Sequence, residues 1–240
     1  MGLSPSASSR GFAVAYPDGI DGVWNVGREV EVNRPGHGPI DDVAFIEDLV
    51  THLVSHGVAD PRKVVVLGVS NGGMMAMRLA CERTTRFAGI GAIVAHMPRP
   101  LLGSCAPQAG LTVLLVAGTK DTLMPWEGGR VVPMGMRDRG EVVSANDTAA
   151  FWRRANGCTE EPVVVQLPDR SPDDGTRVWL SLSERCARFG GRVIACRVEG
   201  GGHTIPGRPY PPGVISRLSG ATTFDVAIDE LVWAAFDRSD

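Results

Sequence analysis

The sequence predicts an α/β fold, in which a mostly parallel sheet is covered by helices on both faces. Strand-like and helix-like segments alternate through the first two-thirds of the chain. The strand-like runs are continuously apolar, as parallel strands buried on both faces require. One of them, Lys63–Leu67, passes directly into Gly68-Val69-Ser70-Asn71-Gly72 and then into helix-forming residues. These three observations predict one α/β domain over residues 1–240, with a serine held at the end of a strand.

Each predicted strand is an apolar, often β-branched run bounded by turn residues. The first, Phe12–Tyr16, is closed by the turn Pro17-Asp18-Gly19. Besides Lys63–Leu67, the expected strands are Ile90–Ala95, Thr112–Ala117, Val163–Gln166, Arg177–Ser181 and Arg192–Val198.

Four segments are predicted to be helices. From Asp41 to His56 the apolar residues recur at helical spacing, with Asp41 as N-cap and Gly57 as the C-terminal stop. A second helix, Gly73–Glu82, follows the serine. Ser144 and Asp147 form a capping box, so a third helix is predicted to run to Asn156-Gly157. The fourth, Phe224–Phe236, places on one face the residues Phe224, Ile228, Leu231, Val232 and Phe236.

Composition limits the kinds of partner. A chain of 240 residues that is 43% hydrophobic can bury a full core. Its net charge of −3 gives no electrostatic reason to bind nucleic acid or an anionic membrane, so a neutral or small substrate is expected. No run approaches the roughly 18 consecutive apolar residues of a membrane span. The first residues lack the basic and apolar pattern of a secretory signal, and the localisation stays unassigned.

The five cysteines are too widely spaced for a C-x-x-C motif, so neither a metal nor another cofactor is expected. An odd number leaves at least one free thiol, and pairing among the others stays open. Cys81 and Cys196 are interpreted as small buried apolar residues.

The serine motif predicts a nucleophile elbow, a turn so tight that the residues two before and two after the serine must lack bulk. Gly68 and Gly72 would supply that space. The alternative is a glycine-rich loop that binds phosphate at a helix N-terminus. That alternative is disfavoured, because the segment has neither G-x-G-x-x-G nor a Walker lysine.

A serine nucleophile requires a base and an orienting carboxylate, which follow it in the order Asp, then His, on this kind of sheet. Asp121 comes just after the strand Thr112–Ala117, and would otherwise be a turn aspartate. His203 lies in a loop rich in glycine and proline, and would otherwise be an exposed loop histidine. The other histidines fall on a predicted helix or precede the serine or the aspartate. Only His203 fits the order.

These residues resemble the esterase and polyhydroxybutyrate depolymerase family, which includes feruloyl and acetylxylan esterases. The resemblance covers residues from about Gly11 to Gly207 and rests on five motifs. They are Tyr16-Pro17-Asp18-Gly19, Trp24-Asn25, Gly68-Val69-Ser70-Asn71-Gly72-Gly73-Met74, Gly118-Thr119-Lys120-Asp121 and Gly200-Gly201-Gly202-His203-Thr204-Ile205-Pro206-Gly207. The resemblance implies an α/β-hydrolase with Ser70 as nucleophile, Asp121 as acid and His203 as base. It also implies that the backbone N–H of Asn71 is an oxyanion donor.

The chain departs from the family pattern in three ways. Family members have a strand and a His-Gly loop upstream of Tyr16, and that loop supplies a second oxyanion donor. This chain starts too late to contain it, so we expect either an N-terminally truncated sheet whose centre is unpaired beside Lys63–Leu67, or another segment in the gap. With one oxyanion donor missing, we expect weak activity. Ile205 stands where relatives commonly carry tryptophan. The Trp24-Asn25 region lacks the nearby cysteine pair of many secreted relatives, although relatives pair cysteines resembling Cys158 and Cys186.

The function predicted from these residues is hydrolysis of a small-molecule or polymeric carboxylic ester through an acyl-enzyme. The alternatives are a catalytically impaired domain that binds a ligand or partner, and acyl transfer or peptide cleavage on the same scaffold. Candidate substrate contacts are Trp24, Asn25, Trp126 and Ile205, with ordinary packing as the alternative for the tryptophans. The oligomeric state is left open.

Overall fold

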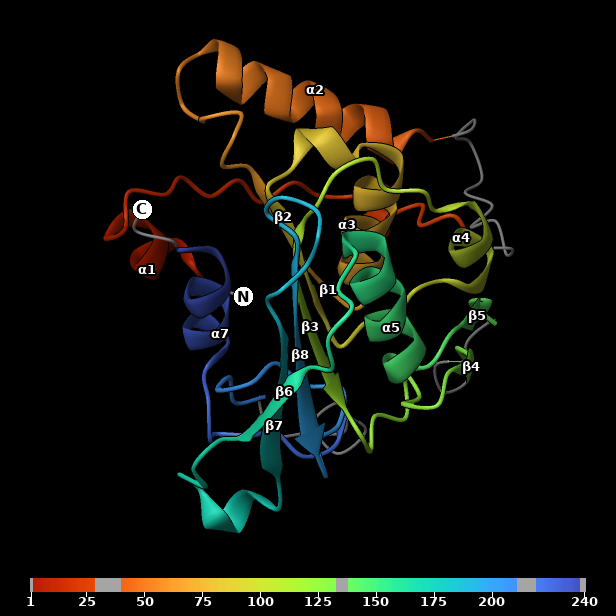
Figure 1. Ribbon diagram of the computed structural model, residues 1–240, viewed down its shortest axis with the longest axis vertical. Coiled ribbons are helices and arrows are strands. Elements are labelled where there is room, and N and C mark those ends of the chain that lie inside the picture. The colour runs from red at the N-terminus through yellow and green to blue at the C-terminus, as the bar shows by residue number, and fades with distance from the viewer. Residues whose placement is uncertain (1, 29–39, 133–137, 211–218, 238–240) are drawn as a thin grey trace.

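A computed structural model describes residues 2–28, 40–132, 138–210 and 219–237 (Figure 1). Within them the main sheet has six strands in the order β1-β2-β3-β8-β7-β6. Their bounds are β1 Val65–Val69, β2 Gly89–Ile93, β3 Thr112–Gly118, β8 Arg192–Glu199, β7 Arg177–Ser183 and β6 Val163–Gln166. The first four in this order are parallel, and β7 and β6 are antiparallel. A separate hairpin pairs β4 (Gly129–Arg130) with β5 (Glu141–Val142).

Helices cover both faces of this sheet, which confirms the predicted α/β architecture (Figure 1). On one side lie α3 (Asn71–Glu82), α4 (Arg99–Ser104) and α5 (Ala145–Asn156). On the other lie α1 (Ser4–Ser8) and α7 (Ile228–Phe236). The helix α2 (Asp42–Ser55) crosses one end of the molecule. Short 3-10 turns occur at η1 (Ile20–Gly22), η2 (Thr84–Arg86) and η3 (Pro172–Asp174).

The two faces carry separate hydrophobic cores, because neighbouring residues of a strand point to opposite sides. On β3, Val113 and Leu115 belong to the core shared with α2, α3 and α5. Leu114 and Val116 belong to the core shared with α7. No helix in the described ranges is both long and apolar enough to cross a membrane.

The predicted caps are confirmed at both long covering helices. The Asp41 carboxylate accepts a hydrogen bond from the Ala44 N–H at 3.0 Å and begins α2. The Ser144 hydroxyl accepts from the Asp147 N–H at 2.9 Å and begins α5. Gly157, with φ of 71°, ends α5 in the left-handed conformation that glycine adopts without strain.

Two predicted elements are wrong. Phe12–Tyr16 is not a strand, because no strand in the described residues lies beside it to complete a ladder; Phe12 instead packs on Trp233, with ring centroids 5.3 Å apart. The last helix begins at Ile228 rather than Phe224. The N–H of Phe224 donates to Asp174, and Asp225 accepts from the N–H groups of Arg170 and Ser171. These bonds hold residues 224–226 against the η3 loop and outside the helix. In agreement with the expected unpaired side, β1 is an edge strand of the described sheet.

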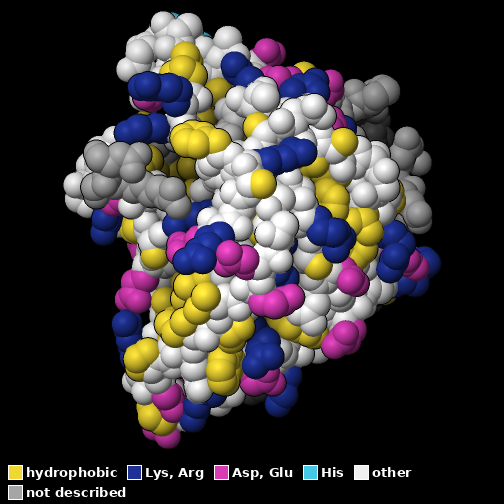
Figure 2. Space-filling view, viewed as in Figure 1, with side chains coloured by type: hydrophobic (Ala, Val, Ile, Leu, Met, Phe, Trp, Pro, Cys, Tyr) yellow, Lys and Arg dark blue, Asp and Glu magenta, His cyan; other side chains and the backbone are white. Residues whose placement is uncertain are grey.

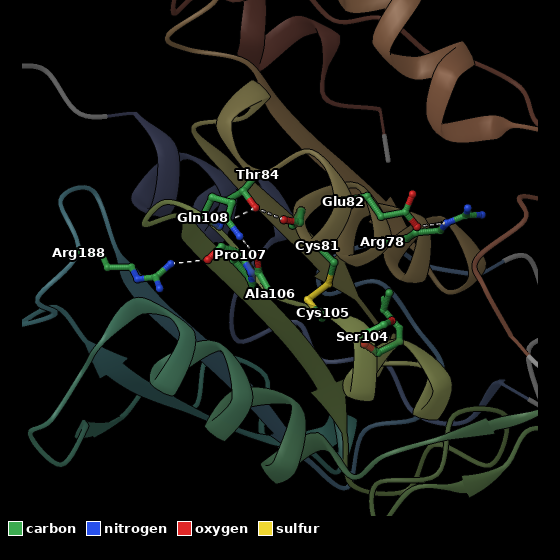
Figure 3. Close-up of a disulfide and its surroundings, with 12 residues drawn as sticks. Arg78, Cys81, Glu82, Thr84, Ser104, Cys105, Ala106, Pro107, Gln108 and Arg188 are labelled. Carbon is green, nitrogen blue, oxygen red and sulfur yellow. Dashed lines mark hydrogen bonds and ion pairs between the residues drawn. A yellow bond between two sulfur atoms is a disulfide. The ribbon is translucent and has the colours of Figure 1, made fainter.

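Four cysteines form disulfides. Cys81–Cys105 joins the end of α3 to the residue after α4 (Figure 3), so the interpretation of Cys81 as simply a small buried apolar residue is wrong. Cys158–Cys186 confirms the pair implied by the family resemblance. Cys196 is a buried free thiol, as predicted, and burial raises its pKa to about 12.

Charged side chains of both signs are interspersed over the face seen in Figure 2. Ion pairs among the described residues include Arg83 with Glu47 at 2.6 Å and Arg170 with Glu230 at 3.1 Å. That face therefore presents no patch of a single sign that would attract a polyanion.

Candidate active site

Ser70 lies on a strained turn between β1 and α3. Its backbone has φ of 52° and ψ of −116°, a conformation that costs free energy for any residue with a Cβ. The Ser70 N–H donates to the Ile93 carbonyl of β2 at 2.8 Å, which holds the turn at the carboxyl end of the sheet. The serine therefore has the backbone geometry of a nucleophile elbow.

The glycine requirement of this turn differs from the prediction at one position. A Cβ at Gly68 would lie 2.0 Å from the Gly72 carbonyl oxygen, so no side chain fits at Gly68. A Cβ at Gly72 would meet only the Trp24 indole nitrogen at 4.0 Å, whereas one at Gly73 would lie 2.6 Å from the Ala95 Cβ. The turn therefore requires Gly68 and Gly73, and the expectation that it requires Gly72 is wrong.

Asp121 is buried at the carboxyl end of β3, with 6% of its surface exposed. One carboxylate oxygen accepts the N–H groups of Leu123 at 2.9 Å and Met124 at 2.8 Å. The other accepts from Nδ1 of His203 at 2.7 Å. Because the two amides fix the carboxylate, its second oxygen is aimed at the imidazole before any substrate binds.

Glycines allow the His203 loop to reach Asp121. A Cβ at Gly118, the last residue of β3, would lie 2.4 Å from the Gly201 carbonyl oxygen. The Lys120 N–H donates to that same carbonyl at 2.8 Å, and the His203 N–H donates to Ser219 at 2.6 Å. The loops that follow β3 and β8 are thus bonded to each other, which brings Asp121 and His203 together from 82 positions apart.

Ser70 lies at the same carboxyl end of the sheet as this pair, since β1, β2, β3 and β8 are parallel neighbours. Among the described residues, no hydrogen bond joins the Ser70 hydroxyl to His203. The structure brings Asp121 and His203 into contact and sets Ser70 at their end of the sheet. A charged carboxylate accepts the Nδ1 proton, which leaves the imidazole Nε2 with a lone pair that can take a proton.

Asn71 is the first residue of α3, where backbone N–H groups have no intrahelical acceptor. Its side chain bonds the backbone of Trp24 twice, accepting from the N–H at 2.7 Å and donating to the carbonyl at 3.1 Å. Trp24 is therefore held against the elbow, within 4.0 Å of where a Gly72 side chain would start.

The other predicted substrate contacts lie in different surroundings. Asn25 is hydrogen-bonded to the start of α2 and the residues before it. Its backbone N–H donates to the Asp42 carboxylate at 2.6 Å, and its side-chain amide donates to the Ile40 carbonyl at 3.2 Å. Ile205 packs against the core beneath α7. Trp126 lines a cavity beside α5. Of the four, Trp24 is the residue that the structure holds at the elbow.

The sequence reasoning missed His96, which was set aside because it precedes Asp121. Only 2% of His96 is exposed, and burial lowers its pKa to about 4, against an opposing effect of the Asp121 charge. The Tyr210 pKa is raised, first by burial and then by the Asp121 charge. His96 follows β2 at the carboxyl end of the sheet. Functional groups concentrate at this end of parallel strands, and this position was the signal available from sequence.

This chain is similar to several known proteins. A family model described as the prolyl oligopeptidase family matches residues 4–98. A protein of Nocardia uniformis subsp. tsuyamanensis that is named esterase NocK is 34% identical over 96% of this chain and 68% of its own length. Feruloyl esterase B of Piromyces equi is 26% identical over 82% of this chain, which spans 35% of that relative.

A solved structure, the acetyl xylan esterase from Aspergillus awamori, superposes with a TM-score of 0.53 at 16% identity. The match covers 85% of this chain and 77% of that one. At this identity the likeness concerns the fold alone.

Proposed function

This chain belongs to the esterase family that includes feruloyl and acetylxylan esterases, and from that membership we propose that it hydrolyses carboxylic esters through an acyl-enzyme on Ser70. The observation that supports the proposal most is the buried Asp121 carboxylate, bonded at 2.7 Å to His203. The strained Ser70 turn at the same end of the sheet adds to it. Because an aspartate–histidine pair also occurs in structural roles, the proposal rests on this pair and the Ser70 turn in combination.

In the proposed reaction, His203 Nε2 takes the Ser70 hydroxyl proton as the oxygen attacks the ester carbonyl. Asp121 holds the Nδ1 proton and stabilises the imidazolium that forms. The Asn71 N–H donates to the developing oxyanion. Collapse of the tetrahedral intermediate breaks the bond to the alcohol, which leaves with the proton from Nε2. A water molecule then attacks the acyl group, with His203 again as base, and releases the acid and free Ser70.

The relatives named feruloyl esterase and acetylxylan esterase favour an ester of a feruloyl or acetyl group, carried on a small molecule or on a polymer such as xylan. We assign one oxyanion donor, Asn71. Loss of one donor from such a site lowers turnover by about 10² to 10³.

The test measures hydrolysis of 4-nitrophenyl acetate and labelling by a fluorophosphonate probe. Ser70→Ala is expected to abolish labelling and to lower kcat by about 10⁴-fold or more. Ser55→Ala, at the exposed end of α2, serves as the matched control and keeps both. Labelling of the Ser70→Ala protein would contradict the proposal. An unlabelled native protein would instead favour the catalytically impaired domain.

A further inference from the structure

Two histidines lie side by side at the C-terminal end of α2, outside the proposed mechanism. His52 is in the last turn of the helix, and His56 is the residue that ends it. Both residues are exposed, their ring centroids are 4.1 Å apart, and the ring planes are inclined by 36°. Residues four positions apart on a helix share one face, so the helix itself holds the two imidazoles together.

A hydrogen bond to the backbone fixes where His56 carries its proton. Its Nδ1 lies 2.8 Å from the His52 carbonyl oxygen, which can only accept, so Nδ1 is the donor. The Ser55 hydroxyl donates to the same carbonyl at 2.9 Å. In the neutral ring the lone pair therefore lies on Nε2. Histidines that bind metal ions commonly have this arrangement, in which one ring N–H is bonded to a carbonyl and the other nitrogen is the ligand.

His52 supplies a second nitrogen. Among the described residues its ring nitrogens have no hydrogen-bond partner, and the residue is exposed. Two imidazoles that bind one ion at about 2.0 Å and at right angles have ring centroids roughly 4 to 5 Å apart. The 4.1 Å separation of His52 and His56 falls in this range. One ion could therefore be reached by both rings through rotation of exposed side chains.

Imidazole nitrogens determine the kind of ion. They suit Cu²⁺, Ni²⁺ and Zn²⁺, whereas Mg²⁺ and Ca²⁺ prefer oxygen ligands. Within the described ranges no cluster of three or more His, Cys, Asp or Glu side chains is placed to hold a metal ion. The pair would therefore supply two ligands, and water would complete the coordination. The sequence expectation of no metal rested on cysteine spacing, which does not bear on histidine ligands.

The histidine pair lies away from the proposed acyl-enzyme centre. The Arg86 guanidinium donates to the Thr51 hydroxyl of α2 at 2.8 Å, and Arg83 pairs with Glu47 at 2.6 Å. Both arginines lie between the end of α3 and the start of β2, at the amino end of the parallel strands (Figure 1). Ser70 lies at the carboxyl end. An ion bound at the C-terminal end of α2 would therefore not contact the serine.

We propose that His52 and His56 form a surface site for a divalent transition-metal ion, with Cu²⁺ preferred. Nε2 of His56 and a ring nitrogen of His52 bind the ion, and the bond from Nδ1 to the backbone orients the His56 ring. The site leaves coordination positions open to a further ligand. It does not depend on the ester chemistry proposed for Ser70.

The experiment titrates the native full chain with CuCl₂, NiCl₂, ZnCl₂ and MgCl₂ by calorimetry. No ester is present, so failure here and failure of the proposed esterase are distinguishable. We expect Cu²⁺ to bind most tightly, Ni²⁺ and Zn²⁺ more weakly, and Mg²⁺ not at all. The electron paramagnetic resonance spectrum of the Cu²⁺ complex should show coupling to two imidazole nitrogens. Absence of Cu²⁺ binding below millimolar concentration, or coupling to a single nitrogen, would overturn the proposal.

Variants test whether the two rings act as one site. His52→Gln and His56→Gln should each weaken Cu²⁺ binding about tenfold or more, because two linked ligands lose their joint advantage when either is removed. The double variant should bind about as weakly as each single variant. Both residues are exposed, so the melting temperature without metal should not change.

His203→Gln is the matched control at the other end of the sheet and should keep the native Cu²⁺ affinity. Loss of Cu²⁺ binding in this control would place the ion at the proposed active site and refute the α2 site. Losses in the two α2 single variants that add in the double variant would show two independent histidines rather than one chelating pair, and would equally contradict the proposal.

Discussion

The two ends of the parallel strands differ in how their polar groups are satisfied. At the carboxyl end, Ser70 and Val94 have φ of 52° and 44°, and His96 has an unpaired ring nitrogen among the described contacts. At the amino end, the Asn156 amide bonds three backbone groups, the N–H and carbonyl of Leu111 and the carbonyl of Arg192. Backbone strain thus lies at the carboxyl end of the sheet, where ligands of parallel sheets bind, whereas the Asn156 amide at the amino end is fully bonded to backbone groups.

The largest expected effect is at the carboxyl end. Asp121→Asn should lower kcat by about 10³ to 10⁴, because an amide no longer stabilises the imidazolium or fixes the Nδ1 proton. The change keeps the size of the side chain and an oxygen for the Leu123 and Met124 N–H groups, so the melting temperature should move little. Steady-state kinetics and thermal unfolding check this, with the exposed Asp48→Asn as control. Unchanged kcat would remove Asp121 from the proposed mechanism.

The amino end should show the opposite behaviour. Asn156→Ala should lower the free energy of unfolding by about 2 to 4 kcal/mol, because it removes the hydrogen-bond partner of the buried N–H and carbonyl of Leu111. Activity per folded molecule should stay the same. Urea unfolding combined with active-site labelling measures both, and Arg154→Ala on the same helix is the control. A loss of activity without a loss of stability would mean that the two ends are not functionally distinct.

Much of this contrast could be read from the sequence. Local signals sufficed for the capping residues Asp41 and Ser144 and for the strand that precedes Ser70. The chain order of Ser70, Asp121 and His203 indicated a common end of the sheet, where the structure pairs the last two. Contacts between segments far apart in the chain determined the features that the sequence did not predict. Phe12–Tyr16 carries a strand pattern but has no neighbouring strand, a condition that local propensity does not contain.

Other features depend on contacts that no sequence pattern specifies. Cys81 pairs with Cys105 because α3 and α4 end side by side, which spacing alone does not reveal. Phe224 follows the helical period, yet the Asp174 side chain of a distant turn bonds its backbone N–H. His96 was rejected by its place in the chain order, although its burial next to Asp121 follows only from the sheet topology.

The pH dependence of stability tests whether the buried, neutral His96 makes the fold less stable at low pH. Its pKa falls from an ordinary 6.5 to about 4 on folding, so between these values the unfolded chain binds more protons. Stability should therefore decrease as the pH drops from 6.5 to 4, by on the order of 2 to 3 kcal/mol from this group. His96→Phe should lose this part of the pH dependence, while His52→Phe retains it. Urea unfolding at pH 7.5 and pH 4.5 compares them, and parallel losses in all three proteins would show that His96 is not responsible.

The smallest expected effect lies inside the elbow itself, where the two motif glycines are not equivalent. Gly72→Ala should be neutral or raise the free energy of unfolding by up to about 1 kcal/mol, since Gly72 is helical and its Cβ would meet nothing closer than 4.0 Å. Gly68→Ala is the matched counterpart and should lose both folding stability and labelling of Ser70, because its Cβ would lie 2.0 Å from a carbonyl oxygen. Thermal unfolding and fluorophosphonate labelling of the two variants make the comparison. If Gly72→Ala proved as damaging as Gly68→Ala, the space around Ser70 would be set by something other than the backbone contact between Gly68 and Gly72.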